Sequence, residues 1–366
     1  MKQMNAFFIR LWVPALCFGL LFASACNDNG GKKTTVNTAD TGSKQPDKLL
    51  APSIDTSLLT VAGINEAADG KNMEIRFYER AAVYTIDKND KLFSGNSSLL
   101  NEALASNIPV KLLSDPATNR INNFVKATEA EVRAYNTGDG FNSMTSKIKS
   151  AAPERIDLSK IDTSQFNRVE KLSKFPVFRL CTNVVPDYNT LVTIFNYCAS
   201  QGCNKPGPYA IPNCIPFQYV IDGCYARAHK MRQMIMDKYG YCCEKVFSYG
   251  EYPSTLAVKA DKWGGCCVRW WYHVVPLLRV KVKRGSLTLQ IAYVIDPGMF
   301  NTPVTLSTWL NAQKNTTCAP NANVTSYSIQ PGTAYTPAGG GTYSTDPNYV
   351  KTEQKLFDYK NLVTCN

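Results

Sequence analysis

The chain has 366 residues, of which 44% are hydrophobic and 11% aromatic, and its formal net charge is +11. This composition excludes a wholly disordered chain, and the length has room for about two domains. No basic run carries interleaved aromatic residues, so we expect no nucleic-acid partner and favour attraction to acidic protein surfaces.

The first 26 residues are typical of a secretory signal. Lys2 and Arg10 flank the start of an apolar run, LWVPALCFGLLFASA, that is too short to remain as a membrane span. The run ends in a sequence similar to a bacterial lipobox, with Ala23 where leucine is more usual, followed by Cys26. We therefore predict that residues 1–26 are a lipoprotein-type signal peptide and that Cys26 carries a lipid. Ordinary cleavage and free secretion are the alternative.

Residues 27–50 are polar, without apolar periodicity, and are predicted to be a flexible tether. In either case we expect an exported chain, in the bacterial cell envelope or secreted, whose only contact with a membrane is the N-terminal lipid. Disulfides persist in such compartments.

The cysteines divide the chain into two parts. Of the 13 cysteines none lies in residues 27–180, whereas eleven lie between Cys181 and Cys365. The net charge is +2 over residues 27–180, from 21 basic and 19 acidic residues, and +7 over residues 181–366, from 17 basic and 10 acidic residues. We place a boundary between about 170 and 181. The domains expected are therefore residues 51–175 and residues 176–366.

An odd number of cysteines predicts a free thiol. Five disulfides would use ten of the eleven and leave one, either as an intermolecular partner or as a catalytic thiol. Two adjacent pairs, Cys242-Cys243 and Cys266-Cys267, lack the C-x2-C spacing of zinc ligands, so we expect no metal.

Cys224 stands at the predicted start of a helix from about Tyr225 to Tyr239, directly after Gly223. Unpaired amides at a helix start favour a thiolate, so a lowered pKa is expected, and a glycine lets a substrate backbone approach. A structural half-cystine is the alternative. His229 is five residues on and is turned about 140° away. We therefore interpret it as a packed or solvated residue and not as the partner of the thiol.

His273 lies in a predicted β-hairpin. With Arg284-Gly285 as a two-residue turn, apolar residues pair with apolar ones, and His273 comes to lie directly opposite Asp296. A carboxylate beside an imidazole fixes its tautomer and stabilises the imidazolium. The order Cys224, His273, Asp296 therefore favours a catalytic triad, although Asp296 alone could be a turn residue before a proline.

Four blocks of sequence, DGCYARAHKMRQ, YGYCCEKVFSYG, CCVRWWYHVV and VIDPGMFNTPVTLSTW, resemble the bacterial protein-glutaminase family, which deamidates glutamine side chains within proteins. The resemblance covers most of residues 181–320. It implies an α+β fold of the transglutaminase-like and papain-like kind, in which a helix that begins at the cysteine packs on an antiparallel sheet. It assigns Cys224, His273 and Asp296 to catalysis and requires no cofactor. Trp270 matches a family tryptophan and is predicted either to line the cleft or to pack in the core.

The upstream half resembles the pro-region of the same family around IRFYERAAVYTI. We expect an α+β pro-domain whose strand at Arg80, Ala81 and Ala82 occupies the substrate channel until a processing protease removes it. A companion domain is the alternative. The expected partners are proteins or peptides with exposed glutamine and that protease, and we expect a monomer.

Two segments depart from the family, GEYPSTLAVKADKWGGCC and the tail from residue 334 onward. Loops near a cleft set substrate choice, so these departures concern the choice of protein substrate. Three other functions stay open at this point: a transglutaminase, a papain-like cysteine protease, and a disulfide-rich envelope module that only binds.

Overall fold

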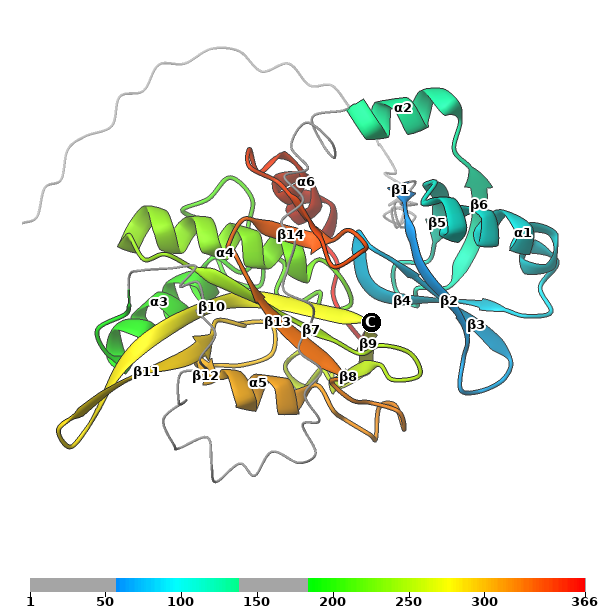
Figure 1. Cartoon of the computed structure of the whole chain (residues 1–366). Coiled ribbons are helices and arrows are strands. Elements are labelled where there is room, and N and C mark those ends of the chain that lie inside the picture. Colours follow the sequence, from blue (N-terminus) through cyan, green and yellow to red (C-terminus); the bar gives the residue numbers. More distant parts are fainter. Residues whose placement is uncertain (1–56, 138–183, 366) are drawn as a thin grey trace, which may run out of the picture. The chain divides into compact units, whose positions relative to one another are not determined.

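The computed structural model describes residues 57–137 and 184–365 (Figure 1). The predictions for the signal peptide, Cys26, the tether of residues 27–50 and the boundary at about 170–181 lie outside the described residues. None of the described helices is long and apolar enough to cross a membrane.

Residues 57–137 form a small α+β unit. Its elements are β1 (Leu58–Leu59), β2 (Val61–Glu66), β3 (Asn72–Phe77), β4 (Arg80–Asp87), α1 (Lys91–Ser106), β5 (Val110–Ser114), β6 (Ile121–Lys126) and α2 (Glu129–Thr137). Helix α1 begins because the Asp90 side chain accepts the Leu92 backbone N–H, and it ends at Asn107 in the left-handed conformation. Strands β2, β3 and β4 pair as an antiparallel meander.

Residues 184–365 form the larger α+β unit. Its elements are α3 (Tyr188–Ser200), α4 (Cys224–Tyr239), β7 (Glu244–Tyr249), β8 (Leu256–Lys259), the 3₁₀ helix η3 (Asp261–Trp263), β9 (Cys267–Trp270), β10 (Tyr272–Arg284), β11 (Leu287–Val294), β12 (Val304–Thr305), α5 (Leu306–Ala312), β13 (Ser326–Gln330), β14 (Ala334–Pro337), β15 (Tyr343–Thr345) and α6 (Val350–Tyr359).

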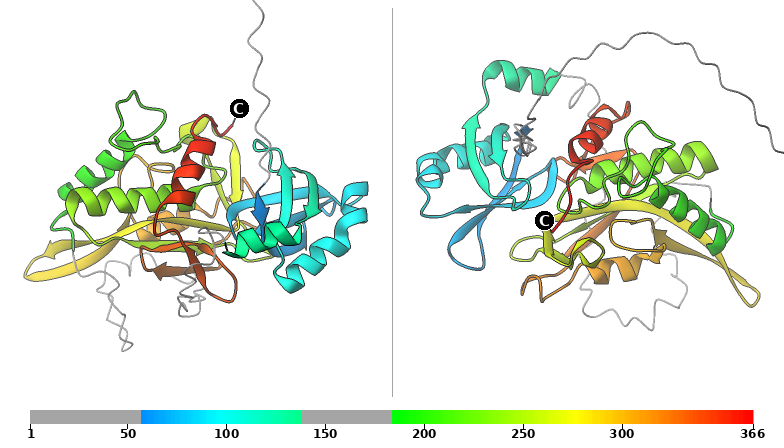
Figure 2. Two further views of the ribbon diagram at one scale, coloured as in Figure 1. Left: turned by 90° about the horizontal axis from the view of Figure 1, so that it is seen from above. Right: turned by 180° about the vertical axis from the view of Figure 1, so that it is seen from behind.

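A five-stranded antiparallel sheet, in the order β12-β11-β10-β7-β13, is the centre of this larger unit. Helix α4 packs against β10, and α3 and α4 lie on one side of the sheet while α5 lies on the other (Figures 1 and 2). The first eight residues of α4, Cys224–Met231, are all buried. The α+β fold predicted from the sequence, with a helix that begins at Cys224 on an antiparallel sheet, is therefore confirmed.

The small unit joins the larger one through a second sheet, in the order β2-β3-β4-β9-β8. Within this sheet the two units pair at Ala82 and Trp270, and Arg76, which donates to the carbonyls of Gly250 and Ser254, joins them as well. Strand β9 leads directly into β10, the strand that carries His273. Strand β4, which pairs with β9, therefore lies next to β10.

The β10–β11 hairpin forms, but its predicted register is wrong by two residues. Arg284 pairs with Leu287, so Gly285 and Ser286 make the turn, and Val282 faces Leu289 instead of Leu287. Gly285 has φ of 59°, which suits a turn position that most residues avoid. A shift of two residues keeps every side chain on its predicted face.

The prediction of one free cysteine is also wrong. Disulfides join Cys203–Cys214, Cys266–Cys365 and Cys267–Cys318, and Cys242 is disulfide-bonded as well. Cys198, Cys224 and Cys243 are free and buried. Parity therefore did not single out Cys224, because Cys198 and Cys243 pack in the core as small apolar residues.

Candidate active site

Cys224 is the first residue of α4, and Gly223 is its N-cap with φ of 80°. A Cβ on residue 223 would come within 2.8 Å of the Tyr359 ring, so both the backbone conformation and the packing require glycine here. The space predicted for a substrate backbone is thus taken by Tyr359. The glycine positions the nucleophile by letting the chain turn sharply into the helix.

His273 and Asp296 lie side by side, as predicted, although strand pairing does not align them. The last pair of the hairpin is Leu277 with Val294, and Asp296 follows the end of β11. His273 Nε2 donates to Asp296 Oδ2 over 2.9 Å. This bond leaves Nδ1 as the basic nitrogen, and Nδ1 is buried without a hydrogen-bond partner among the described residues.

Two tryptophans hold this pair. The His273 ring stacks on Trp270, with centroids 4.5 Å apart, and faces Trp309 at 5.4 Å. Trp309 Nε1 also donates to Asp296 Oδ2 over 3.0 Å. Burial raises the pKa of Asp296, but the bond and charge of His273 and the bond from Trp309 outweigh it, so the pKa lies below its ordinary value. The carboxylate is therefore ionised and fixed.

The Cys224 thiol lies beside the same strand, because the backbone N–H of Val274 donates to its sulfur. Only 2% of Cys224 is exposed. Burial raises the pKa of the thiol to about 12, and Arg227 opposes this only in part. The prediction of a lowered pKa is therefore wrong for this form of the chain. The helix start favours a thiolate, but the loss of water outweighs it.

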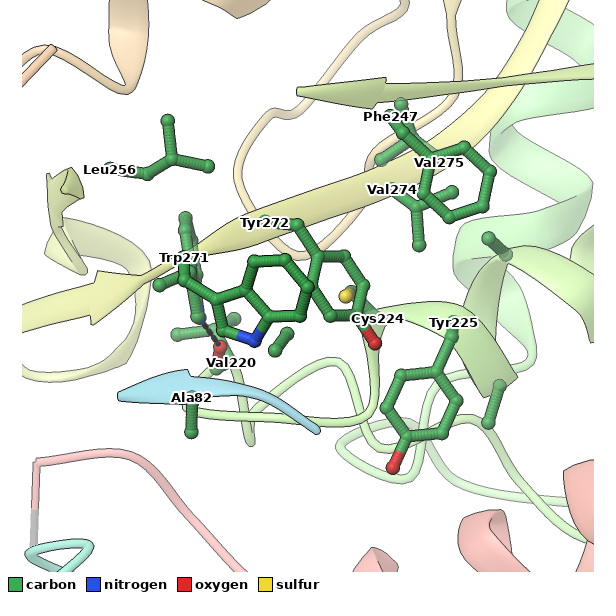
Figure 3. Packing of buried hydrophobic residues seen from close by; sticks show 14 of the residues in the cluster. Ala82, Val220, Cys224, Tyr225, Phe247, Leu256, Trp271, Tyr272, Val274 and Val275 are labelled. Atoms are coloured by element: carbon green, nitrogen blue, oxygen red, sulfur yellow. Dashed lines mark hydrogen bonds between the residues drawn. The ribbon is translucent and has the colours of Figure 1, made fainter. Parts of the chain in front are cut away.

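Strand β4 is bonded to residues that flank the thiol. The Ala81 backbone N–H donates to Asp222 Oδ1 over 2.9 Å, and its carbonyl accepts the Trp271 backbone N–H over 3.0 Å. Ala81 and Ala82 are fully buried. Figure 3 shows Ala82, Trp271, Tyr272 and Cys224 within one buried cluster. The backbone of β4 is thus bonded to Asp222, two residues before the candidate nucleophile, and to Trp271.

Comparison with known proteins gives one family and several structures. A family model described as Glutaminase matches residues 191–313. A crystal structure of pro-protein-glutaminase is 31% identical, and the match covers 85% of this chain and 94% of that chain with a TM-score of 0.62. A mutant of pro-protein-glutaminase is 29% identical over 86% and 95% of the two chains, also with a TM-score of 0.62. The chain belongs to the protein-glutaminase family. No curated protein sequence matches it.

The pro-protein-glutaminase matches extend through both described units, so this chain is a family member in its pro-form. Family membership supports a hydrolase that acts on amides and deamidates protein glutamine. Among the described residues, no group of three or more His, Cys, Asp or Glu side chains could hold a metal ion.

Other residues singled out in the sequence take structural positions in this chain. Trp270 is fully buried, and its indole N–H donates to the carbonyls of Val220 and Ile221, so it packs the site from within. His229 is buried as well: its Nδ1 accepts from Lys245, and its Nε2 donates to the carbonyl of Asp346. Burial lowers the pKa of His229 to about 2.

Sequence reasoning missed three residues that hold the Asp296 loop. Lys262 Nζ donates to the carbonyls of Pro297 and Phe300, over 2.7 and 2.8 Å, and Trp263 Nε1 donates to the carbonyl of Gly298 over 2.8 Å. Trp309 is the third. The sequence marks the segment of Lys262 and Trp263 only as a departure from the family pattern, whereas both residues fix the turn after the candidate catalytic aspartate.

Proposed function

We propose that this chain hydrolyses the side-chain amide of protein-bound glutamine to glutamate and ammonia, with Cys224 as the nucleophile. The observation that carries the proposal is the buried His273–Asp296 pair, bonded at 2.9 Å, on the strand whose next residue, Val274, contacts the Cys224 sulfur. The basic Nδ1 of His273 has no other hydrogen bond among the described residues and is available to take the thiol proton.

The chemistry follows from these positions. The thiolate attacks the carboxamide carbon, and backbone N–H groups in the first turn of α4 stabilise the negative oxygen. The carbon–nitrogen bond then breaks as the imidazolium gives its proton to the leaving ammonia. Water, deprotonated by His273, attacks the thioester, and the carbon–sulfur bond breaks to leave glutamate and the thiol. Asp296 holds the ring in the required tautomer throughout.

We further propose that residues 51–175 are a pro-region and residues 176–366 the catalytic domain. The support is the covering strand: with Ala81 bonded between Asp222 and Trp271, and the thiol 2% exposed, a substrate has no room at Cys224. A processing protease would have to remove or release β4. The small side chains of Ala81 and Ala82 offer the thiol no amide to attack, and Arg80 has none either.

Export is part of the same proposal. The disulfides, with the signal-like residues 1–26, support a bacterial envelope or secreted enzyme, tethered by a lipid on Cys26 if that residue is modified. We propose that it acts as a monomer on exposed glutamines.

The test uses the full chain, processed by limited proteolysis and then incubated with a glutamine-containing protein and a fluorescent primary amine. Ammonia release without amine incorporation or chain cleavage is expected. Incorporation would indicate a transglutaminase, cleavage a protease, and no reaction of any kind a binding module. Cys224→Ala should abolish ammonia release, whereas Cys198→Ala, which removes another buried free thiol, should retain it.

A further inference from the structure

Arg80 is a long cationic side chain on β4. A strand that only covered the thiol would need no charged residue at this position. Arg80 is 2% exposed, and its Nη1 donates to the Tyr225 hydroxyl over 2.9 Å. The same nitrogen lies 3.7 Å from Asp222 Oδ2. A cation buried so completely needs fixed acceptors and a negative charge.

Arg80 Nη2 donates to Ser57 Oγ over 2.9 Å within the small unit, whereas Tyr225 and Asp222 belong to the larger unit. Asp222 is two residues before the nucleophile, and Tyr225 is one residue after it. The hydroxyls of Tyr225 and Tyr359 donate to Asp222 Oδ2, over 3.3 and 2.8 Å. Processing that removes β4 therefore leaves this cluster of one carboxylate and two phenols in place.

The charged groups around the thiol also favour a cation at the position of Arg80. Asp222, Arg227 and Asp296 are buried and all act on the Cys224 thiol. Among these three groups the carboxylates outnumber the guanidinium, and Arg80 supplies a second guanidinium 3.7 Å from Asp222. Removal of β4 takes this second cation away, while Asp222 and its two phenol partners stay beside the reacting atoms.

We propose that Asp222, Tyr225 and Tyr359 form a cation-binding subsite, and that the enzyme prefers glutamines directly preceded by arginine or lysine. This inference rests on the proposed function. A substrate strand that makes the backbone hydrogen bonds of Ala81, to Asp222 Oδ1 and from the Trp271 N–H, places its preceding side chain where Arg80 lies. Arg80 thus reports the chemistry of the substrate residue that replaces it.

The preference has a definite chemical origin. A charged side chain in the subsite gains hydrogen bonds to a buried hydroxyl and the attraction of a buried carboxylate, which a neutral side chain of the same shape does not gain in full. A glutamate at that position would place a second negative charge beside Asp222, so it should be rejected. Alanine should fall between the two.

The experiment compares peptides that differ only in the residue before a single glutamine: arginine, citrulline, alanine or glutamate. Citrulline has the shape of arginine without its charge. With the full chain processed by limited proteolysis, ammonia release should give a kcat/KM at least about tenfold higher for arginine than for citrulline. Equal values for the two peptides would overturn the inference and leave the proposed function intact. No ammonia from any peptide would instead refute the proposed function.

Two variants locate the subsite. In Asp222→Asn, which retains an oxygen for a backbone N–H, the arginine-to-citrulline ratio should fall to about one; an unchanged ratio would overturn the assignment to Asp222. Tyr225→Phe, which removes the direct acceptor of the guanidinium, should reduce the ratio by a few-fold. The comparison of peptides with the unmodified enzyme stands even if a variant fails to fold.

Discussion

Alkylation of Cys224 should be strongly suppressed while β4 covers it. A thiol pKa of about 12 leaves about one molecule in 10⁴ as thiolate at pH 8, whereas the ordinary value of 9.0 would leave about one in ten. The reactive population is therefore lower by about a thousandfold, and the 2% exposure of the residue reduces the rate further. We expect removal of β4 to let water reach the sulfur and to let the helix start stabilise the anion.

The assay is alkylation by iodoacetamide, followed by mass spectrometry of the peptide that contains residue 224, before and after limited proteolysis. Before processing, the rate should rise about tenfold for each pH unit between 7 and 10, because a raised pKa leaves the neutral thiol dominant throughout. After processing it should be far higher at pH 8. Cys243, whose pKa burial also raises to about 12, is the matched control and should stay slow in both forms. An equal rate for Cys224 before and after processing would refute the covering role of β4.

Three further changes test the site. Trp309→Phe removes the 3.0 Å hydrogen bond to Asp296, so kcat should fall about tenfold with little change in KM. Because that bond lowers the pKa of Asp296, the acid limb of the pH profile of kcat should move to higher pH. An unchanged pH profile would contradict this role of Trp309. Lys262→Met should lower kcat several-fold and reduce the melting temperature, whereas Lys259→Met, at an exposed ion pair, should do neither. In the folded chain His229 stays neutral because its pKa is about 2, whereas in the unfolded chain it takes up a proton below about pH 6.5. Its contribution to the free energy of unfolding is therefore complete above pH 6.5 and falls by up to ~1.4 kcal/mol per pH unit as the pH drops toward 2. His229→Gln should flatten that slope in denaturant titrations, and an unchanged slope would assign the effect to other groups.

The hairpin shows how far the sequence alone could lead. Apolar matching identified both strands and the faces of their side chains, and it brought His273 close to Asp296. It could not separate two registers that differ by two residues, because both place the same side chains on the same face. The turn decided between them, and Gly285 fits the first turn position better than the second.

The electrostatics of Cys224 could not be predicted from its neighbours in sequence. The dipole of α4 is a local property that the sequence indicates, whereas the burial that dominates the pKa comes from tertiary packing, which the neighbours of Cys224 in the sequence do not reveal. The pairing of Arg80 with Asp222 could not be predicted for the same reason, because the two residues lie far apart in the sequence. Both contacts depend on how two units pack, and no pattern within either unit encodes that.

The cysteine count failed for a different reason. It assumed that every thiol except the nucleophile would be oxidised, whereas Cys198 and Cys243 lie free in the core. The choice of Cys224 therefore depends on its place at a helix start, on the order of the three candidate residues and on the family resemblance, and not on parity.

The central claim, that the Cys224 thiol attacks the glutamine side chain, is tested most directly with an electrophilic glutamine analogue. A peptide in which diazo-oxo-norleucine replaces glutamine should alkylate the processed protein once, at Cys224, and a glutamine peptide in excess should protect against it. The unprocessed chain should remain unlabelled. Labelling of a different residue, or undiminished ammonia release after Cys224 is fully modified, would contradict the account.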